Sequence, residues 1–501
     1  MSMGWCRGVG HFGLQPAREV KNAACYRSRR CFCCASTEDR ASAAEPDIYR
    51  RAQAVVPEQI LPKVRAPHRF MTWLAQPPCG VDVSRVQVTK QDGADASQLC
   101  VVSKYDIPPG QTIVKIPAEL GIWMLDTSSA DTNDEDAERH GANVRLAEWI
   151  LGEWHEDRVD FSLIDRKQYE PYLNLLPTWS QAPVCVCTNE ELAELEIPHD
   201  VFVAHVLASA FQDVMLKMSS SNSGHTVKSM QSALGAALSR PHNVSLTDSR
   251  DNSLRSYTVL VPLLDFINHS CTPNASWFYD DAEKEFLVYA STSIRAGDQI
   301  CVSYGLRPSS EWSLFYGFVP TTLTESSTNG RKMGLMNPGE SVVLFEDGHD
   351  FHDWASRRYI RKLGKHGVPE PFASLDEDLR LCIDSPDDAL QIACQAFRTL
   401  LESHGMHVSE YEMLSARALE ILAGCKSCIL DDVQFLSTVH DEEYVRGLLD
   451  WDDYGRVRAI MFSPSGARAP DYNRQNKFLD LFVLSRFLQK KLLWSYILQE
   501  H

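Results

Sequence analysis

Short apolar stretches separated by turn signals dominate residues 67–325 and predict a domain built from short strands. An apolar run covers 257–264, residues 286–290 read as a buried strand, and residues 294–300 read as a turn into the next strand. A short helix is predicted at 70–74, and further strands are predicted at 86–88, 99–102 and 113–117.

Two regions instead show apolar residues at the three- and four-residue spacing of helices. The first is an insert at about 140–250, with helices predicted near 146–154, 190–192, 201–218 and 233–239. The second is a C-terminal lobe at 326–501, with amphipathic helices predicted at 389–401, 411–423 and 477–499. The predicted fold class is therefore α+β: a short-strand domain with a helical insert, followed by a mainly helical lobe.

Composition narrows the possible partners. The 501 residues are 44% hydrophobic, which is ordinary for a soluble globular chain of roughly two to four domains. A formal net charge of −18 argues against a general nucleic-acid binder, because such proteins usually present a basic surface. The sequence has no run of 18 apolar residues, so no membrane span is expected.

The first 37 residues are rich in arginine and poor in acids. They contain no apolar core of the kind found in secretory signals, and their profile is typical of an organelle transit peptide. Residues 1–60 are therefore predicted to be a transit peptide and linker. The cysteines of this segment match no zinc-binding spacing; they are Cys6, Cys25, Cys31, Cys33 and Cys34.

Three polar or aromatic segments carry the candidate chemistry. The first follows the 257–264 run and contains Asp265, Asn268 and His269. The second is Ser303-Tyr304-Gly305, and the third is Tyr316-Gly317-Phe318. Taken alone, a strand tyrosine or a loop histidine is more often structural than functional. The informative feature is that the three segments occur together and in this order.

This ordered set resembles the core of a SET-domain methyltransferase, in the branch of the Rubisco large-subunit methyltransferases and relatives that modify non-histone proteins. The resemblance covers 67–320 well and 326–501 loosely. It implies a protein-lysine N-methyltransferase that uses S-adenosylmethionine, with a C-terminal lobe that helps to engage a lysine-presenting protein substrate. It also implies a plastid location, with mitochondrion or cytoplasm as alternatives. A monomer is favoured, and from charge and hydropathy neither nucleic acid nor membrane is expected as a partner.

The resemblance also assigns roles to residues. Tyr304 is expected beside the transferring methyl group as the catalytic residue. The expected cofactor-binding residues are Gln98, Leu99, Arg240, Asn268, His269, Tyr304, Tyr316 and Phe318. The expected substrate contacts are Asp265, Arg240 and Trp277. No metal is expected, because the Asp-rich segment 126–138 lacks a calcium-loop pattern and the pair Cys425 and Cys428 lacks a second pair.

These residue types suit methyl transfer to an amine. The reaction needs an aligned nucleophile and an exclusion of water more than it needs strong acids or bases. A free lysine has a pKa near 10.4, so a desolvated channel favours the neutral amine that reacts. Aromatic faces suit both a sulfonium and an alkylammonium group.

Two departures from the family pattern keep other functions open. The family usually has Gly-x-Gly-Leu where this chain has Ala96-Ser97-Gln98-Leu99, and Ser310 stands where relatives often carry Asn. A catalytically silent SET-like module that binds a protein partner is therefore the alternative function. Histidine also stays open as the acceptor residue instead of lysine.

Overall fold

The computed structural model describes residues 61–90, 98–126, 141–152, 165–178, 180–220, 224–247, 253–325, 332–363, 378–383, 385–403, 405–461 and 478–498. The predicted transit peptide and linker at 1–60, with its five cysteines, lies outside these residues. Ala96, Ser97 and the part of the Asp-rich segment that starts at 127 also lie outside them.

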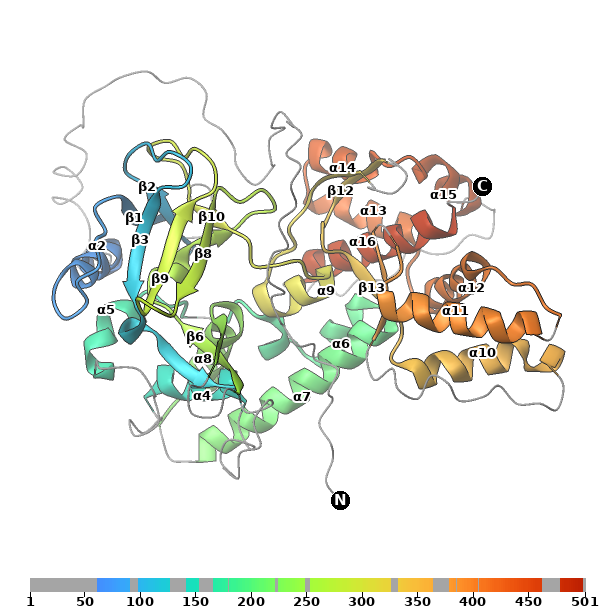
Figure 1. Cartoon of the computed structure of the whole chain (residues 1–501), viewed down its shortest axis with the longest axis horizontal. Helices are drawn as coiled ribbons and strands as arrows, with labels where there is room; N and C mark the ends of the chain where they lie inside the picture. The colour runs from blue at the N-terminus through green and yellow to red at the C-terminus, as the bar shows by residue number, and fades with distance from the viewer. Residues whose placement is uncertain are drawn as a thin grey trace. The chain divides into compact units, whose positions relative to one another are not determined.

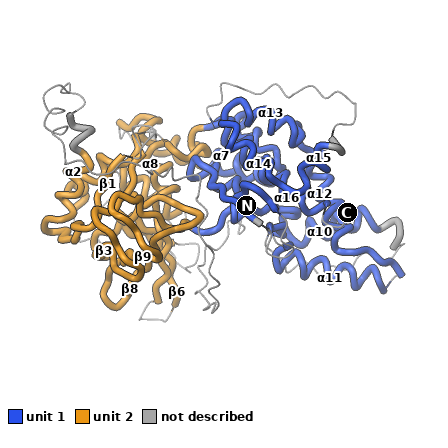
Figure 2. The backbone as a smooth tube through the Cα atoms, turned by 90° about the horizontal axis from the view of Figure 1, so that it is seen from above, with its two compact units in different colours: residues 1–29, 187–210, 305–501 blue, residues 30–186, 211–304 orange. Residues whose placement is uncertain are grey.

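The chain folds into two compact units (Figure 2). The strand-rich unit comprises the described residues up to 186 together with 211–304, and the helical unit comprises the described residues of 187–210 and 305–501. The helical unit thus takes in part of the predicted insert, and it resumes at 305, where the sequence suggested a boundary at 326. The domain boundaries drawn from the sequence stay predictions.

Short strands build the strand-rich unit (Figure 1). One antiparallel sheet has the order β3 (Thr112–Pro117), β9 (Glu285–Ala290), β8 (Ala275–Asp280). A second has the order β4 (Ile122–Leu125), β6 (Leu254–Leu260), β5 (His242–Thr247). β1 (Val86–Lys90) pairs antiparallel with β2 (Leu99–Ser103), and β7 (Asn268–His269) pairs parallel with β10 (Cys301–Val302). The helices of this unit are α2 (Leu61–Ala75), α4 (Ala142–Leu151), α5 (Glu170–Leu173) and α8 (Val227–Ser239).

Strand β9 lies in the middle of its sheet and buries one face. Phe286, Val288 and Ala290 are fully buried, whereas the side chains between them are half-buried. The predicted strand is confirmed, and its burial is complete on one face only. The predicted turn after it is confirmed at Gly297, whose φ of 86° lies in the left-handed region that favours glycine.

The helical unit begins with α6 (Asn189–Leu192) and the first part of α7 (Pro198–Ser220), and the division between the units falls within α7. After a short turn at α9 (Ser309–Glu311), β11 (Thr322–Glu325) pairs antiparallel with β12 (Lys332–Met336). β13 (Ser341–Phe345) pairs antiparallel with β14 (Leu379–Cys382), and α10 (Gly348–Leu363) lies between these two strands in the chain. The remaining helices are α11 (Asp388–Ser403), α12 (Glu410–Gly424), α13 (Ile429–Val439), α14 (Glu442–Leu449), α15 (Tyr454–Met461) and α16 (Leu479–Ile497). The predicted α+β class is confirmed.

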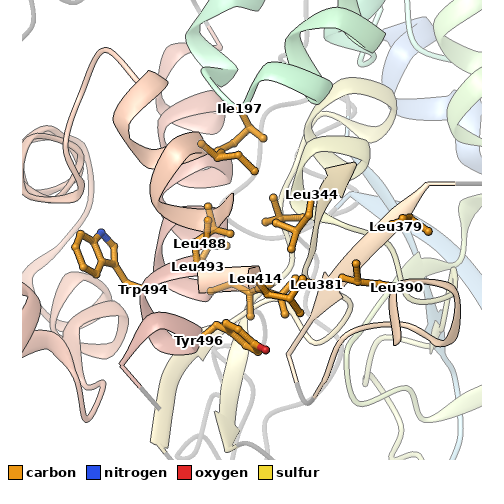
Figure 3. Close-up of a cluster of buried hydrophobic side chains, with 14 of the residues drawn as sticks. Ile197, Leu344, Leu379, Leu381, Leu390, Leu414, Leu488, Leu493, Trp494 and Tyr496 are labelled. Atoms are coloured by element: carbon orange, nitrogen blue, oxygen red, sulfur yellow. The ribbon is translucent and has the colours of Figure 1, made fainter. Parts of the chain in front are cut away.

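One apolar core holds the helical unit together (Figure 3). Leu488 and Leu493 of α16 lie in it with Leu344 of β13, Leu381 of β14 and Leu414 of α12. The sequence predicted an amphipathic helix here, but α16 is buried on all sides, including Arg486, Lys490 and Lys491, each no more than 1% exposed. Helix α16 is therefore the central helix of the unit, and its charges need buried partners.

Helix α7 is unusually apolar for its exposure. Its stretch Pro198–Met218 is long and apolar enough to cross a membrane by length and composition, with a mean hydropathy of 1.4. The sequence had suggested no such segment. One such helix is weak support for a membrane span, because core helices of soluble proteins meet the same criteria.

Candidate active site

A strained turn connects the end of β6 to the segment that contains Asp265. Leu263 has a φ of 82° although it is not glycine, and its side chain is fully buried. A single 3₁₀ turn, Leu264–Phe266, follows, and β7 begins two residues later. Because such a conformation persists only where the surrounding packing holds it, this turn is a feature of the kind found at functional sites.

Tyr304 lies against this segment, as the two ordered motifs suggested. Its hydroxyl donates to the carbonyl oxygen of Ile267 at 2.8 Å, and its backbone N–H donates to Nδ1 of His269 at 3.1 Å. The parallel pairing of β7 with β10 brings the two motifs together although they are 35 residues apart in sequence. Since Nδ1 of His269 accepts this bond, a neutral His269 carries its proton on Nε2.

The neighbouring strand β2 meets the same segment through Asn268. The Asn268 amide donates to the carbonyl oxygen of Leu99 at 3.3 Å, while Gln98 is exposed beside it. Asn274, to which the sequence assigned no role, also links this loop to β10. Its amide donates to Gln299 at 2.8 Å, and its oxygen accepts the N–H of Cys301 at 2.8 Å.

Asp265 is the buried carboxyl of the site, with a fully buried side chain. Tyr172 of α5 donates its hydroxyl to Asp265 Oδ2 at 2.8 Å. Arg240, at the C-terminal end of α8, donates from Nη1 to the backbone oxygen of Asp265 at 3.0 Å, and Nη1 lies 4.0 Å from Oδ2. The Arg240 guanidinium also lies over the Phe266 ring at 5.2 Å. Sequence reasoning assigned no role to Tyr172.

Electrostatics mark the same carboxyl. Burial raises the pKa of Asp265 to about 6, while the Arg240 charge and the Tyr172 hydrogen bond act against that rise. Burial also raises the pKa of Tyr172 well above its usual value, so this phenol stays a donor. A strongly perturbed carboxyl beside a specific charged partner is a pattern typical of functional sites.

Trp277 lies elsewhere in the strand-rich unit, on β8. It makes an edge contact with the His242 ring at 4.8 Å, and burial lowers the pKa of His242 to about 4. The ring centroid of Trp277 also lies 6.4 Å from that of Phe286. No contact recorded among the described residues joins Trp277 to Tyr304 or Asp265, and its role in substrate binding stays a prediction.

Tyr316 and Phe318 belong to the helical unit. Both stack near Trp312, at 4.9 Å and 5.2 Å between ring centroids, and the Arg307 guanidinium lies 5.5 Å from the Tyr316 ring centroid. Ser310, just before them, is buried. The two rings form an aromatic group, and their contact with the cofactor stays a prediction.

Metal and thiol chemistry find little support in the described ranges. No group of three or more histidine, cysteine or acidic side chains there could hold a metal ion. Cys428 lies at the N-terminal cap of α13, and burial raises the pKa of Cys425 to about 11, which disfavours a reactive thiolate.

Comparison with known proteins identifies the domain that carries this site. Residues 98–305 match the family model of the SET domain. The chain is 32% identical over 101 residues to the SET domain-containing protein 8 of Schizosaccharomyces pombe; the match covers 20% of this chain and 21% of that protein. The chain thus spans about a fifth of the length of the curated relative it matches.

Solved structures give two further comparisons. The SET domain of LSMT bound to lysine and AdoHcy aligns with a TM-score of 0.49 and 17% identity, over 87% of this chain and 90% of that one. Rubisco LSMT bound to AdoMet aligns with a TM-score of 0.48 and 16% identity, over 86% and 90%.

The matched region begins at Gln98 before β2 and ends at Gly305, directly after Tyr304, so it contains both polar motifs and the Asp265 network. Residues 98–305 therefore form a SET domain, as the motifs suggested. The SET domain is the fold of a family of protein-lysine methyltransferases.

Proposed function

We propose that the protein is a protein-lysine N-methyltransferase that uses S-adenosylmethionine and acts on a non-histone protein. The observation that carries this proposal is the position of Tyr304, whose hydroxyl is held on the Ile267 carbonyl oxygen inside the segment that also contains Asn268 and His269. The match of residues 98–305 to the SET domain supports the reaction type.

The described residues fit such a cofactor. Asp265 Oδ1 and Arg240 Nε are buried and have no hydrogen-bond partner among the described residues. S-adenosylmethionine has a carboxylate, which suits the guanidinium of Arg240. It also has an ammonium group, which suits the free carboxylate oxygen of Asp265, a residue that the resemblance assigned to the substrate. When bound, this cofactor supplies an electrophilic methyl group.

The chain's own residues would orient the acceptor. Because the Tyr304 hydroxyl donates its hydrogen bond to the Ile267 carbonyl oxygen, the lone pairs of the phenolic oxygen can accept a hydrogen bond from an amine. A hydrogen bond of this kind would align the nitrogen lone pair with the methyl group, which is the main requirement of the transfer. A water-poor site would favour the neutral form of the acceptor lysine.

The test measures cofactor binding and turnover on the full chain. Titration calorimetry with S-adenosylhomocysteine should show binding, and mass spectrometry of a lysine-containing peptide library should show added methyl groups on lysine. Tyr304→Phe should lower kcat at least about tenfold while the Kd for S-adenosylhomocysteine changes less than about threefold. Tyr105→Phe is the matched control, because Tyr105 is 63% exposed.

Each opposite result is informative. Absence of heat at millimolar cofactor would instead favour a silent module that binds a partner. Methyl groups found on histidine would show that histidine, and not lysine, is the acceptor. Unchanged turnover in Tyr304→Phe would remove Tyr304 from the reaction.

A further inference from the structure

Two side chains from separate segments meet at one buried carboxyl, that of Asp265. Tyr172 comes from α5, Arg240 follows α8, and Asp265 belongs to the turn after β6. Tyr172 and Asp265 are joined at 2.8 Å, and Arg240 contacts the backbone of Asp265 at 3.0 Å. Tyr172 itself is fully buried, so it does not face solvent.

The two oxygens of Asp265 are used differently. Oδ2 accepts the Tyr172 hydrogen bond, whereas Oδ1 is buried without a partner among the described residues. The Nε atom of Arg240 is likewise buried without a partner there. One side of the pair is thus tied to the protein, and the other side keeps unused hydrogen-bonding groups, which buried polar atoms rarely do unless a ligand completes them.

We propose that Tyr172 is a positioning residue, which holds the Asp265 carboxylate ionised and oriented so that Asp265 and Arg240 together present their free atoms to the ligand of the site. This inference rests on the proposed function, which names that ligand as the amino-acid end of S-adenosylmethionine. Tyr172 acts through Asp265 and touches no ligand itself.

The surroundings explain why one hydroxyl matters. Phe70 of α2 and Phe266 lie 6.2 Å and 6.0 Å from the Tyr172 ring, and these apolar walls exclude water. The charged or titratable groups that face the Asp265 carboxyl are Arg240 from the end of α8 and Tyr172 from α5. With so few partners, loss of the Tyr172 donor leaves the buried charge poorly stabilised.

The consequence depends on pH. Burial already raises the pKa of Asp265 to about 6, and the Tyr172 hydrogen bond acts against that rise. Without this bond the pKa rises further, so Asp265 is largely protonated near neutral pH and attracts neither Arg240 nor an ammonium group. At alkaline pH the carboxylate ionises again and the site recovers, which a purely structural role of Tyr172 would not produce.

The experiment compares Tyr172→Phe with the unmodified protein. The substitution keeps the ring and its packing and removes only the hydroxyl. The Kd for S-adenosylhomocysteine should be about tenfold weaker in the variant at about pH 6.5 and within about twofold of the unmodified value at about pH 9. Asp265→Asn should bind weakly at both pH values, and Tyr105→Phe should match the unmodified protein. Equal weakening of Tyr172→Phe at both pH values, or none, would overturn the inference.

A second measurement does not depend on the cofactor. In the unliganded protein the raised pKa of Asp265 makes its contribution to stability largest in acid and lost as pH rises through about 6. In Tyr172→Phe the melting temperature should show this loss at a higher pH than in the unmodified protein, because the pKa of Asp265 is raised further. Asp265→Asn has no carboxyl at this position and should not show the loss. If the unmodified protein binds no cofactor but the melting profiles differ in this way, the proposed function fails and the link between Tyr172 and Asp265 stands. Identical melting profiles of Tyr172→Phe and the unmodified protein would refute that link.

Discussion

Replacement of Lys490 by Met should strongly destabilise the helical unit. Lys490 is 1% exposed, and its ammonium lies 2.9 Å from Glu196 Oε2 and 2.9 Å from Asp432 Oδ2. It also donates to the Ser427 hydroxyl at 2.7 Å. Arg486 contacts the same two carboxylates, at 3.1 Å and 2.9 Å. The two buried negative charges are therefore balanced only when both cations are present.

The magnitude follows from what the substitution leaves behind. Methionine fills the space of the lysine stem, but Glu196 and Asp432 are 2% and 0% exposed and lose one of their two cations. Breaking a buried ion pair by removing one partner costs about 3–5 kcal/mol, because the remaining charge is uncompensated. Although burial works to raise it, the pKa of Glu196 is lowered overall, with Lys490 and Arg486 responsible.

Hydrogen exchange followed by mass spectrometry is the suitable assay, because it reports on peptides of α16 separately from the strand-rich unit. Protection of these amides should fall about a hundredfold or more in Lys490→Met. Arg446→Ala is the matched control: its ion pair with Glu442 is 2.8 Å long, but both side chains are exposed, and its loss should change stability by less than about 0.5 kcal/mol. If Lys490→Met changed protection no more than Arg446→Ala, the network would not stabilise the unit.

Three other predictions follow from single features. Asn268→Ala removes the hydrogen bond to Leu99, so it should weaken S-adenosylhomocysteine binding and lower stability by about 1 kcal/mol. The control Asn243→Ala changes an exposed residue and should do neither. An Asn268→Ala variant with unchanged cofactor affinity and unchanged melting temperature would contradict the assignment. Gly334→Ala should destabilise the helical unit by at least about 1 kcal/mol in urea unfolding, because Gly334 has a φ of 63° and a Cβ would lie 2.6 Å from the Gly447 oxygen. Residues 1–60 fused to a fluorescent reporter should direct it to an organelle, with a plastid favoured, and diffuse cytosolic fluorescence would refute the transit-peptide prediction.

The sequence by itself determined the local features of the protein. A short apolar run placed β9, and helical spacing placed α11 and α12, each within a few residues, because these patterns follow from the geometry of a single strand or helix. The ordered motifs also predicted that the Asp265 segment and Tyr304 would serve one site, and the pairing of β7 with β10 brings them together. The SET domain was predicted from the same motifs and is confirmed by the match of residues 98–305.

Only the tertiary structure showed which distant side chains meet. Tyr172 and Asp265 are 93 residues apart, and nothing in either local pattern indicates that they pair. The charges on α16 looked like the polar face of an amphipathic helix, and their burial depends on Glu194, Glu196 and Asp432 from other segments. Residues 187–210 likewise looked like part of the insert but join the helical unit. Periodicity reports which face of an element is apolar, whereas the partner of a buried charge is decided by long-range packing.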